Sequence, residues 1–186
     1  MEFDEKGNFC ISEIEIIQVF SYAFKRLVTE DKHLLESGVQ ERALQFKLAL
    51  YLRELLKFAE CGGLSIDVEY NRDGEKSKKR PDPSCEKSWI APDIILHERG
   101  SAGYENDDRY KNDIIYCEIK KDSESGKPDA VKIEEQMRNR KYQFGIDLFS
   151  LNKKDISFDL YILKNNEPVK TACYKYNFEK QELDEC

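Results

Sequence analysis

The fold of this chain is decided by two isoleucine-rich stretches, Ile90-Ala-Pro-Asp-Ile-Ile-Leu-His97 and Asp113-Ile-Ile-Tyr-Cys-Glu-Ile-Lys-Lys121. Each is short, apolar and bounded by Gly, Asn or Asp, a pattern typical of two β-strands joined by a long turn. Because side chains two apart in a strand share a face, Asp93, Ile95 and His97 should lie together. In the second stretch the residues that share a face are Ile114, Tyr116, Glu118 and Lys120. The pattern therefore predicts two carboxylates and an amine near the ends of neighbouring strands, among residues that favour burial.

Composition limits the class of protein. The chain has 186 residues, 40% hydrophobic and 36% charged, which predicts one domain with a sizeable core. No apolar run approaches the roughly 20 residues of a membrane span, and the acidic start is unlike a signal peptide. We therefore expect a cytoplasmic protein without membrane contact. The net charge of −7 argues against a protein that coats nucleic acid, but it is compatible with an enzyme that has a local basic patch.

The six cysteines show no paired spacing of the kind that binds a metal. Cys61 and Cys117 fall in apolar patterns, which favours reduced thiols in a cytosol over a disulfide framework.

Helical spacing of apolar residues predicts helices over 11–35, 39–60 and 129–142. Ser37 and Gln40 have the spacing of a capping box between the first two helices. Gly62 and Gly63 should end the second helix, and Gly145 the third.

The remaining periodic segments are strands. Alternation predicts a half-buried strand over 64–72 and further strands over 146–151, 156–163 and 169–176, the last two joined by a turn at Asn165-Asn166. The order of elements implies one α/β sandwich. We expect a helical segment at 1–37 packed on a core domain at 38–178, and an acidic, frayed tail at 179–186.

The residues could perform metal-assisted phosphodiester hydrolysis. Mg²⁺ or Mn²⁺ takes carboxylate oxygens, which Asp93 and Glu118 could supply, with the backbone carbonyl of Ile119 as a third ligand. Lys120 could orient the attacking water or stabilise charge on phosphorus, and Glu41 on the preceding helix could complete the site. There is no Gly-x-Ser-x-Gly elbow and no phosphate-binding loop of the Walker type.

Structural explanations stay open for the same residues. An Asp after Pro can simply cap a turn, and a Glu-x-Lys pair in a strand can face solvent. Glu41 can be a favourable charge at a helix N-terminus. The basic run Lys76, Lys78, Lys79 and Arg80 is either solvated surface or a loop that contacts phosphates.

Pro92-Asp93 followed by Glu118-Ile119-Lys120, after a helix bearing Glu41, resembles the signature of the PD-(D/E)xK nuclease superfamily. Over residues 38–148 the chain is similar to one group of bacterial proteins in that superfamily. The matching segments are Glu41-Arg42-x-Leu44 with a following Leu-Ala-x-Tyr-Leu helix, Val68-Glu69-Tyr70-Asn71-Arg72, Pro92-Asp93-Ile94-Ile95-x-His97-x-Arg99-Gly100, Glu118-Ile119-Lys120-Lys121 and Asp129-x-x-Lys132.

The resemblance implies a restriction-endonuclease-like fold, with a central mixed sheet flanked by helices. It implies that Asp93 and Glu118 bind Mg²⁺, that Lys120 is the catalytic lysine, and that Glu41 completes the site. Glu69 is a candidate additional ligand, and Gln136 could correspond to a polar helix residue of some branches. The implied nucleic-acid contacts are Asn71, Arg72, Lys78, Lys79, Arg80, His97, Arg99 and Lys121; for His97 a hydrogen-bonded strand histidine is the alternative.

Two functional hypotheses follow from the sequence. The first is a metal-dependent nuclease that cuts DNA in preference to RNA. The second is a nuclease-fold protein without turnover, a binding or regulatory module such as an antagonist or subunit of a defence system. The charge of −7 and the absence of an attached DNA-reading domain favour the second hypothesis. Fold alone does not decide between these two functions. Whether the chain forms a homodimer also stays open.

Overall fold

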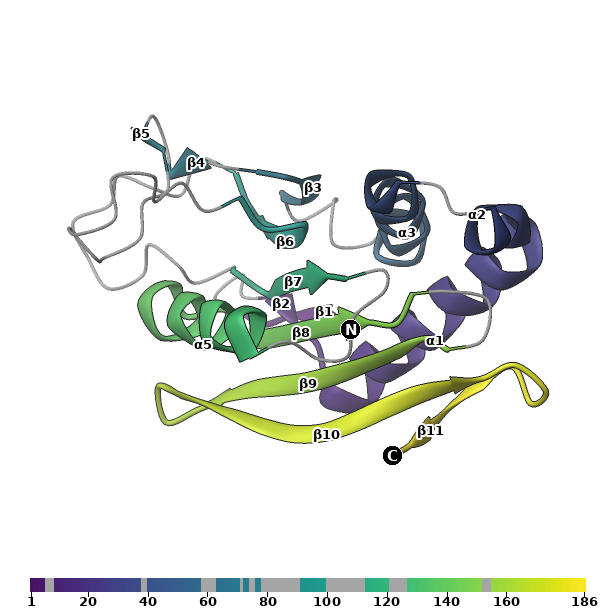
Figure 1. Cartoon of the computed structure of the whole chain (residues 1–186). Coiled ribbons are helices and arrows are strands. Elements are labelled where there is room, and N and C mark those ends of the chain that lie inside the picture. The colour runs from purple at the N-terminus through teal and green to yellow at the C-terminus, as the bar shows by residue number, and fades with distance from the viewer. Residues whose placement is uncertain are drawn as a thin grey trace.

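The computed structural model describes residues 1–5, 9–37, 40–57, 63–70, 72–73, 76–77, 91–99, 113–120, 127–151 and 155–186. This part of the chain is a mixed α/β structure with a seven-stranded sheet and four helices (Figure 1). The expected α/β class is confirmed.

The large sheet runs in the order β11-β10-β9-β8-β7-β6-β3. All neighbouring strands are antiparallel except β7 and β8, which are parallel. A parallel pair needs a crossover connection, and α5 lies in it. The strand bounds are β3 Leu64–Val68, β6 Ile94–Glu98, β7 Ile115–Ile119, β8 Phe144–Phe149, β9 Ser157–Lys164, β10 Glu167–Asn177 and β11 Glu182–Glu185.

Helices cover both faces of this sheet. On one face, α1 (Glu13–Glu30) and α3 (Glu41–Leu55) pack together, with the short α2 (Lys32–Glu36) between them in sequence. On the other face, α5 (Lys127–Arg140) packs on β7 and β8 (Figure 1). Each face has its own apolar core; the one under α5 consists of Ile95, Tyr116, Ile133, Met137, Tyr142 and Tyr161.

The helix predicted over 11–35 is interrupted at Asp31. The Asp31 side chain is buried. It accepts a hydrogen bond from the Tyr51 hydroxyl and forms an ion pair with Lys47 at 3.1 Å. These bonds to α3 hold Asp31 between the two helices. The capping box belongs to α1, where Ser12 and Glu15 bond reciprocally, whereas Gln40 makes no side-chain cap at the start of α3.

Gly145 was expected to end the third helix, and this was wrong. The helix ends at Arg140, and Lys141 adopts the left-handed conformation with φ 60°. Gly145 lies inside β8, directly below α5. A Cβ there would stand 2.4 Å from Ile133 Cγ2 and 2.5 Å from Met137 Sδ, so glycine permits the close packing of helix on sheet.

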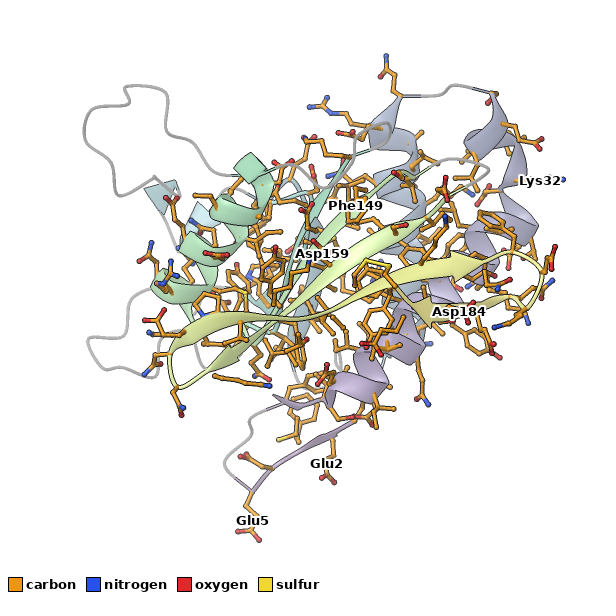
Figure 2. All side chains as sticks on the ribbon, turned by 60° about the horizontal axis from the view of Figure 1, so that its bottom comes forward. Glu2, Glu5, Lys32, Phe149, Asp159 and Asp184 are labelled. Atoms are coloured by element: carbon orange, nitrogen blue, oxygen red, sulfur yellow. A yellow bond between two sulfur atoms is a disulfide. The ribbon has the colours of Figure 1, made fainter. Side chains whose placement is uncertain are left out.

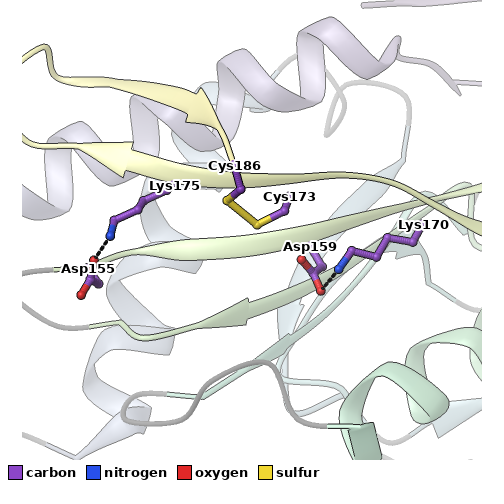
Figure 3. The surroundings of a disulfide bond; sticks show 6 residues. All are labelled: Asp155, Asp159, Lys170, Cys173, Lys175 and Cys186. Carbon is purple, nitrogen blue, oxygen red and sulfur yellow. Dashed lines mark hydrogen bonds and ion pairs between the residues drawn. A yellow bond between two sulfur atoms is a disulfide. The ribbon is translucent and has the colours of Figure 1, made fainter.

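The tail after Phe178 was expected to be frayed, and this too was wrong. β11 pairs with β10 in the register Tyr174↔Glu185 to Asn177↔Glu182, and a disulfide joins Cys173 to Cys186 (Figure 3). The expectation of reduced thiols therefore fails for this pair, while Cys117 is buried and unbridged. The polar side chains concealed the strand because backbone pairing does not require apolar residues.

In the described part of the chain, two pairs of short strands form separate two-stranded sheets. β1 (Glu2–Phe3) and β2 (Phe9–Cys10) form an antiparallel ladder; Glu2 and the nearby Glu5 project from the body of the molecule (Figure 2). β4 (Arg72–Asp73) pairs with β5 (Lys76–Ser77). The turn at Asn165-Asn166 is confirmed, both residues having positive φ. None of the described helices has the length and apolar character needed to span a membrane.

Candidate active site

Asp93 directly precedes β6, and Glu118 lies in β7, the neighbouring strand of the sheet. The ladder between β6 and β7 pairs Ile94 with Cys117 and Ile95 with Tyr116, and continuing it by one residue pairs Asp93 with Glu118. Directly opposite residues on one face have Cβ atoms about 5 Å apart. Asp93 Oδ2 also accepts a hydrogen bond from the backbone N–H of Ile119, with 2.6 Å between the nitrogen and the oxygen. Within the strands, Ile95 and Tyr116 share the face under α5 as the two-residue period predicts, whereas Ile114 packs in the core of the other face.

Helix α3 holds Asp93 from the other side. Gln45, which is buried, donates from Nε2 to the Asp93 carbonyl at 2.6 Å and to Asp93 Oδ1 at 3.3 Å. Glu41 lies one turn earlier on the same helix, and its charge acts on both Asp93 and Lys120. The predicted helix carboxylate therefore lies within electrostatic reach of the cluster.

Glu118 is almost fully buried and is paired with a lysine of α5. Lys132 Nζ lies 2.6 Å from Glu118 Oε2, while Oε1 is buried and has no hydrogen-bond partner among the described residues. Burial raises the pKa of Glu118 to about 7; Lys132 opposes this shift and Asp93 adds to it. Burial likewise raises the pKa of Asp93, against the effect of the Ile119 N–H and Lys132.

Lys120 is partly exposed and lies 4.0 Å from Asp129 Oδ2 at the first turn of α5. Burial disfavours its charge, but Asp129, Glu41, Asp93 and Glu118 outweigh it and raise the pKa of Lys120. Lys120 is therefore an ammonium at neutral pH, which suits it to stabilise negative charge and not to act as a base.

A row of acids continues from Glu118 across the sheet. Glu118 is the register partner of Asp147 on β8, and Asp147 is that of Asp159 on β9 (Asp159 is labelled in Figure 2). Asp159 pairs with Lys170 (Figure 3). Asp147 is fully buried with neither oxygen bonded among the described residues; burial, Asp129 and Asp159 raise its pKa to about 7.

Of the other predicted residues, Glu69 borders this cluster, since its backbone N–H donates to the Asp93 carbonyl at 3.3 Å. The Glu69 carboxylate pairs with Arg42 at 2.8 Å at the edge of the sheet, so its role as a further ligand stays a prediction. His97 Nε2 lies 3.0 Å from Asp67 Oδ2, and Arg99 binds the same carboxylate. The alternative of a hydrogen-bonded strand histidine fits this arrangement.

Several predicted contacts cannot be placed. Asn71, Lys78, Lys79, Arg80 and Lys121 lie outside the described residues, and for Arg72 only the backbone in β4 is described. Gln136 is buried on α5.

The donor set is compatible with a hard divalent cation. Mg²⁺ needs only one or two carboxylates and keeps several waters. Asp93 and Glu118 provide two neighbouring carboxylates, and Glu118 Oε1 is a buried acceptor without a partner in the described part of the chain. No three His, Cys, Asp or Glu side chains of the described residues gather as a metal-binding group. The ion would therefore depend on two carboxylates, the Ile119 carbonyl and water.

Sequence reasoning missed the roles of Gln45, Lys132 and Asp147. Gln45 follows Glu41 by four residues, so helical spacing could have placed both on one side of α3. Lys132 forms part of the Asp129-x-x-Lys132 segment, but its pairing with Glu118 requires the crossover of α5. Asp147 was hidden within a strand pattern because its burial comes from the helix above it.

Comparisons of the chain with protein-family models, with curated proteins and with solved structures found no match.

Proposed function

We propose that this protein is a metal-dependent nuclease that hydrolyses phosphodiester bonds, with DNA as the preferred substrate. One observation carries the proposal: Asp93 and Glu118 are the next residues of the two segments beyond the last pair of the β6–β7 ladder, and Lys120 directly follows β7. Two neighbouring carboxylates with the Lys120 ammonium within electrostatic reach match the chemistry of metal-assisted phosphodiester hydrolysis.

The order of elements supports the restriction-endonuclease-like fold. Helix α3 is followed by the antiparallel set β3-β6-β7, by α5 and by the parallel strand β8. The candidate residues all come from the first part of this unit: Glu41 from α3, Asp93 before β6, and Glu118 and Lys120 at the end of β7. This agrees with the distribution that the sequence resemblance implies.

Asp93 and Glu118 would hold the cation, which when bound supplies a Lewis acid and an acidified water. Asp93 is preorganised for this role, since Gln45 and the Ile119 N–H fix its carboxylate. Lys120 stabilises the negative charge that develops on the phosphoryl oxygens, because nearby carboxylates keep it protonated. Glu41 contributes negative charge that favours both the cation and the Lys120 ammonium.

Cleavage of supercoiled plasmid with Mg²⁺, Mn²⁺ or EDTA tests the proposal, alongside single-stranded DNA and an RNA transcript. D93N, E118Q and K120M should each reduce the rate by about a hundredfold or more, since each removes a transition-state interaction. D184N and K175M are matched controls on β11 and β10, where Asp184 bonds Asn177 and Lys180, and Lys175 pairs with Asp155. Cleavage that survives all three site substitutions would reject the proposal.

The basic residues Lys78, Lys79 and Arg80 are the proposed phosphate contacts. The logarithm of the nucleic-acid binding constant falls linearly with the logarithm of the salt concentration. Replacing all three residues by neutral ones should make this slope less steep by about 0.9 for each phosphate contact that is lost. An unaltered slope would assign this run to ordinary solvated surface.

A second candidate function is a binding module without turnover. It is favoured by the ion pair in which Lys132 already neutralises Glu118, and by the net charge of −7. This alternative would be identified if the protein binds nucleic acid but cleaves neither plasmid, single-stranded DNA nor RNA in the presence of Mg²⁺ or Mn²⁺.

A further inference from the structure

The ion pair between Lys132 and Glu118 lies where the proposed metal site would be. Lys132 Nζ is 2.6 Å from Glu118 Oε2, with side-chain exposures of 20% for the lysine and 3% for the glutamate. Of the lysines close to the two carboxylates, Lys120 makes its 4.0 Å contact with Asp129 instead. Lys132 is therefore the ammonium that binds a candidate metal ligand directly.

This one ammonium acts on both carboxylates. Its charge opposes the effect of burial at Glu118 and at Asp93 alike. Without a counter-ion, a buried carboxylate is costly, and removing one member of a buried pair destabilises strongly. Lys132 thus explains how the site tolerates two neighbouring acids when no cation is bound.

A divalent ion and Lys132 need the same carboxylate, that of Glu118. Glu118 Oε1 accepts no hydrogen bond among the described residues, so it is the oxygen that Lys132 leaves for an ion. Sharing the carboxylate would place the ammonium and the cation within a few ångströms, where their repulsion in a poorly solvated site is large. The lysine has a flexible four-carbon stem and is one-fifth exposed, so its ammonium can move to water while the stem stays packed.

We propose that Lys132 is a resident counter-cation that competes with the divalent ion for Glu118 and leaves this carboxylate when the ion binds. Lys132 is a positioning residue that sets the metal concentration at which the site fills. This inference rests on the proposed function, because it takes Asp93 and Glu118 as the ligands. It adds a regulatory step that depends on α5.

Titration calorimetry with Mn²⁺ at pH 8.5 tests the competition in wild type, K132M, K132R and E118Q. K132M should bind Mn²⁺ about tenfold more tightly, because the ion then meets no competing ammonium. K132R should resemble wild type, since it keeps the charge. K170M is the matched control: Lys170 pairs with the buried Asp159 on the same face of the sheet, and its removal should leave the affinity unchanged.

A measurement on the unmodified chain covers the case in which K132M does not fold. Reductive methylation followed by mass spectrometry compares the labelling rates of Lys132 and Lys170. Mg²⁺ should accelerate the labelling of Lys132 several-fold and leave that of Lys170 unaltered. Equal labelling of Lys132 with and without Mg²⁺ would overturn the inference.

The outcomes separate the inference from the proposed function. If E118Q abolishes Mn²⁺ binding while K132M binds no more tightly than wild type, the metal site stands and the competition is wrong. If wild type binds no Mn²⁺, or E118Q binds it unchanged, the proposed metal site fails and the inference fails with it.

Discussion

Replacing Asp147 by Asn should stabilise the protein at pH 8 and have little effect at pH 4. Asp147 is fully buried on β8, and neither of its carboxylate oxygens has a hydrogen-bond partner among the described residues. Burial, with the nearby charges of Asp129 and Asp159, raises its pKa from 3.8 to about 7. An amide of the same shape does not ionise.

The expected size follows from linkage. Between pH 4 and pH 7 the folded protein keeps a proton on Asp147 that the unfolded chain releases, so stability falls as pH rises through this range. A pKa raised from 3.8 to about 7 corresponds to at most roughly 4 kcal/mol above pH 7. Solvent screening reduces this figure, and we expect a gain of about 2 kcal/mol for D147N at pH 8.

Urea unfolding of wild type and D147N at pH 4, 6 and 8 measures this gain, which should grow steadily with pH. D184N is the control, since Asn177 and Lys180 lower the pKa of the partly exposed Asp184 and its removal should not stabilise the protein at pH 8. A difference between wild type and D147N that is the same at all three pH values would refute the reasoning. Asp147 would then be ionised or paired in the folded protein.

The packing of α5 on β8, the disulfide at the C-terminus and the support of Asp93 by α3 can each be tested by substitution. G145A should destabilise the protein by about 1–3 kcal/mol in urea unfolding, because the new Cβ meets α5 at 2.4 Å; full stability would mean that the helix lies further from β8. Reductant should lower the stability of wild type by roughly 3 kcal/mol, as expected for the short loop closed by the disulfide at Cys186. C186S should be insensitive to reductant and should exchange the amides of β11 faster; protection equal to wild type would contradict this. Q45L should weaken Mn²⁺ binding about fivefold, since it removes a hydrogen bond that orients Asp93; unchanged affinity would leave Gln45 a packing residue.

The two central strands were predictable because their residues obey a local rule. A period of two fixed which of Asp93, Glu118 and Ile119 share a face, and the ladder between β6 and β7 follows that prediction. The turn at Asn165-Asn166 was predictable for a similar reason, since asparagine tolerates the positive φ that the turn requires.

The errors arose where a distant contact overrides the local signal. Gly145 has the character of a helix stop, but it lies in β8 because only glycine leaves room for Ile133 and Met137. The residues of β11 are polar, yet pairing with β10 and the bond to Cys173 order them. Asp31 interrupts a well-formed apolar period because Tyr51 and Lys47 bind it from another helix.

The acids Glu118, Asp147 and Asp159 occupy aligned positions on three neighbouring strands, and all three are buried. Stability alone does not explain this row, because apolar residues of similar volume in such positions are often neutral or stabilising. Two of the acids have a lysine partner from another element, Lys132 or Lys170, while the third has none among the described residues. The row begins at Glu118, which lies beside Asp93 and Lys120. Burying a carboxylate there is costly, and binding a cation would give that carboxylate a function.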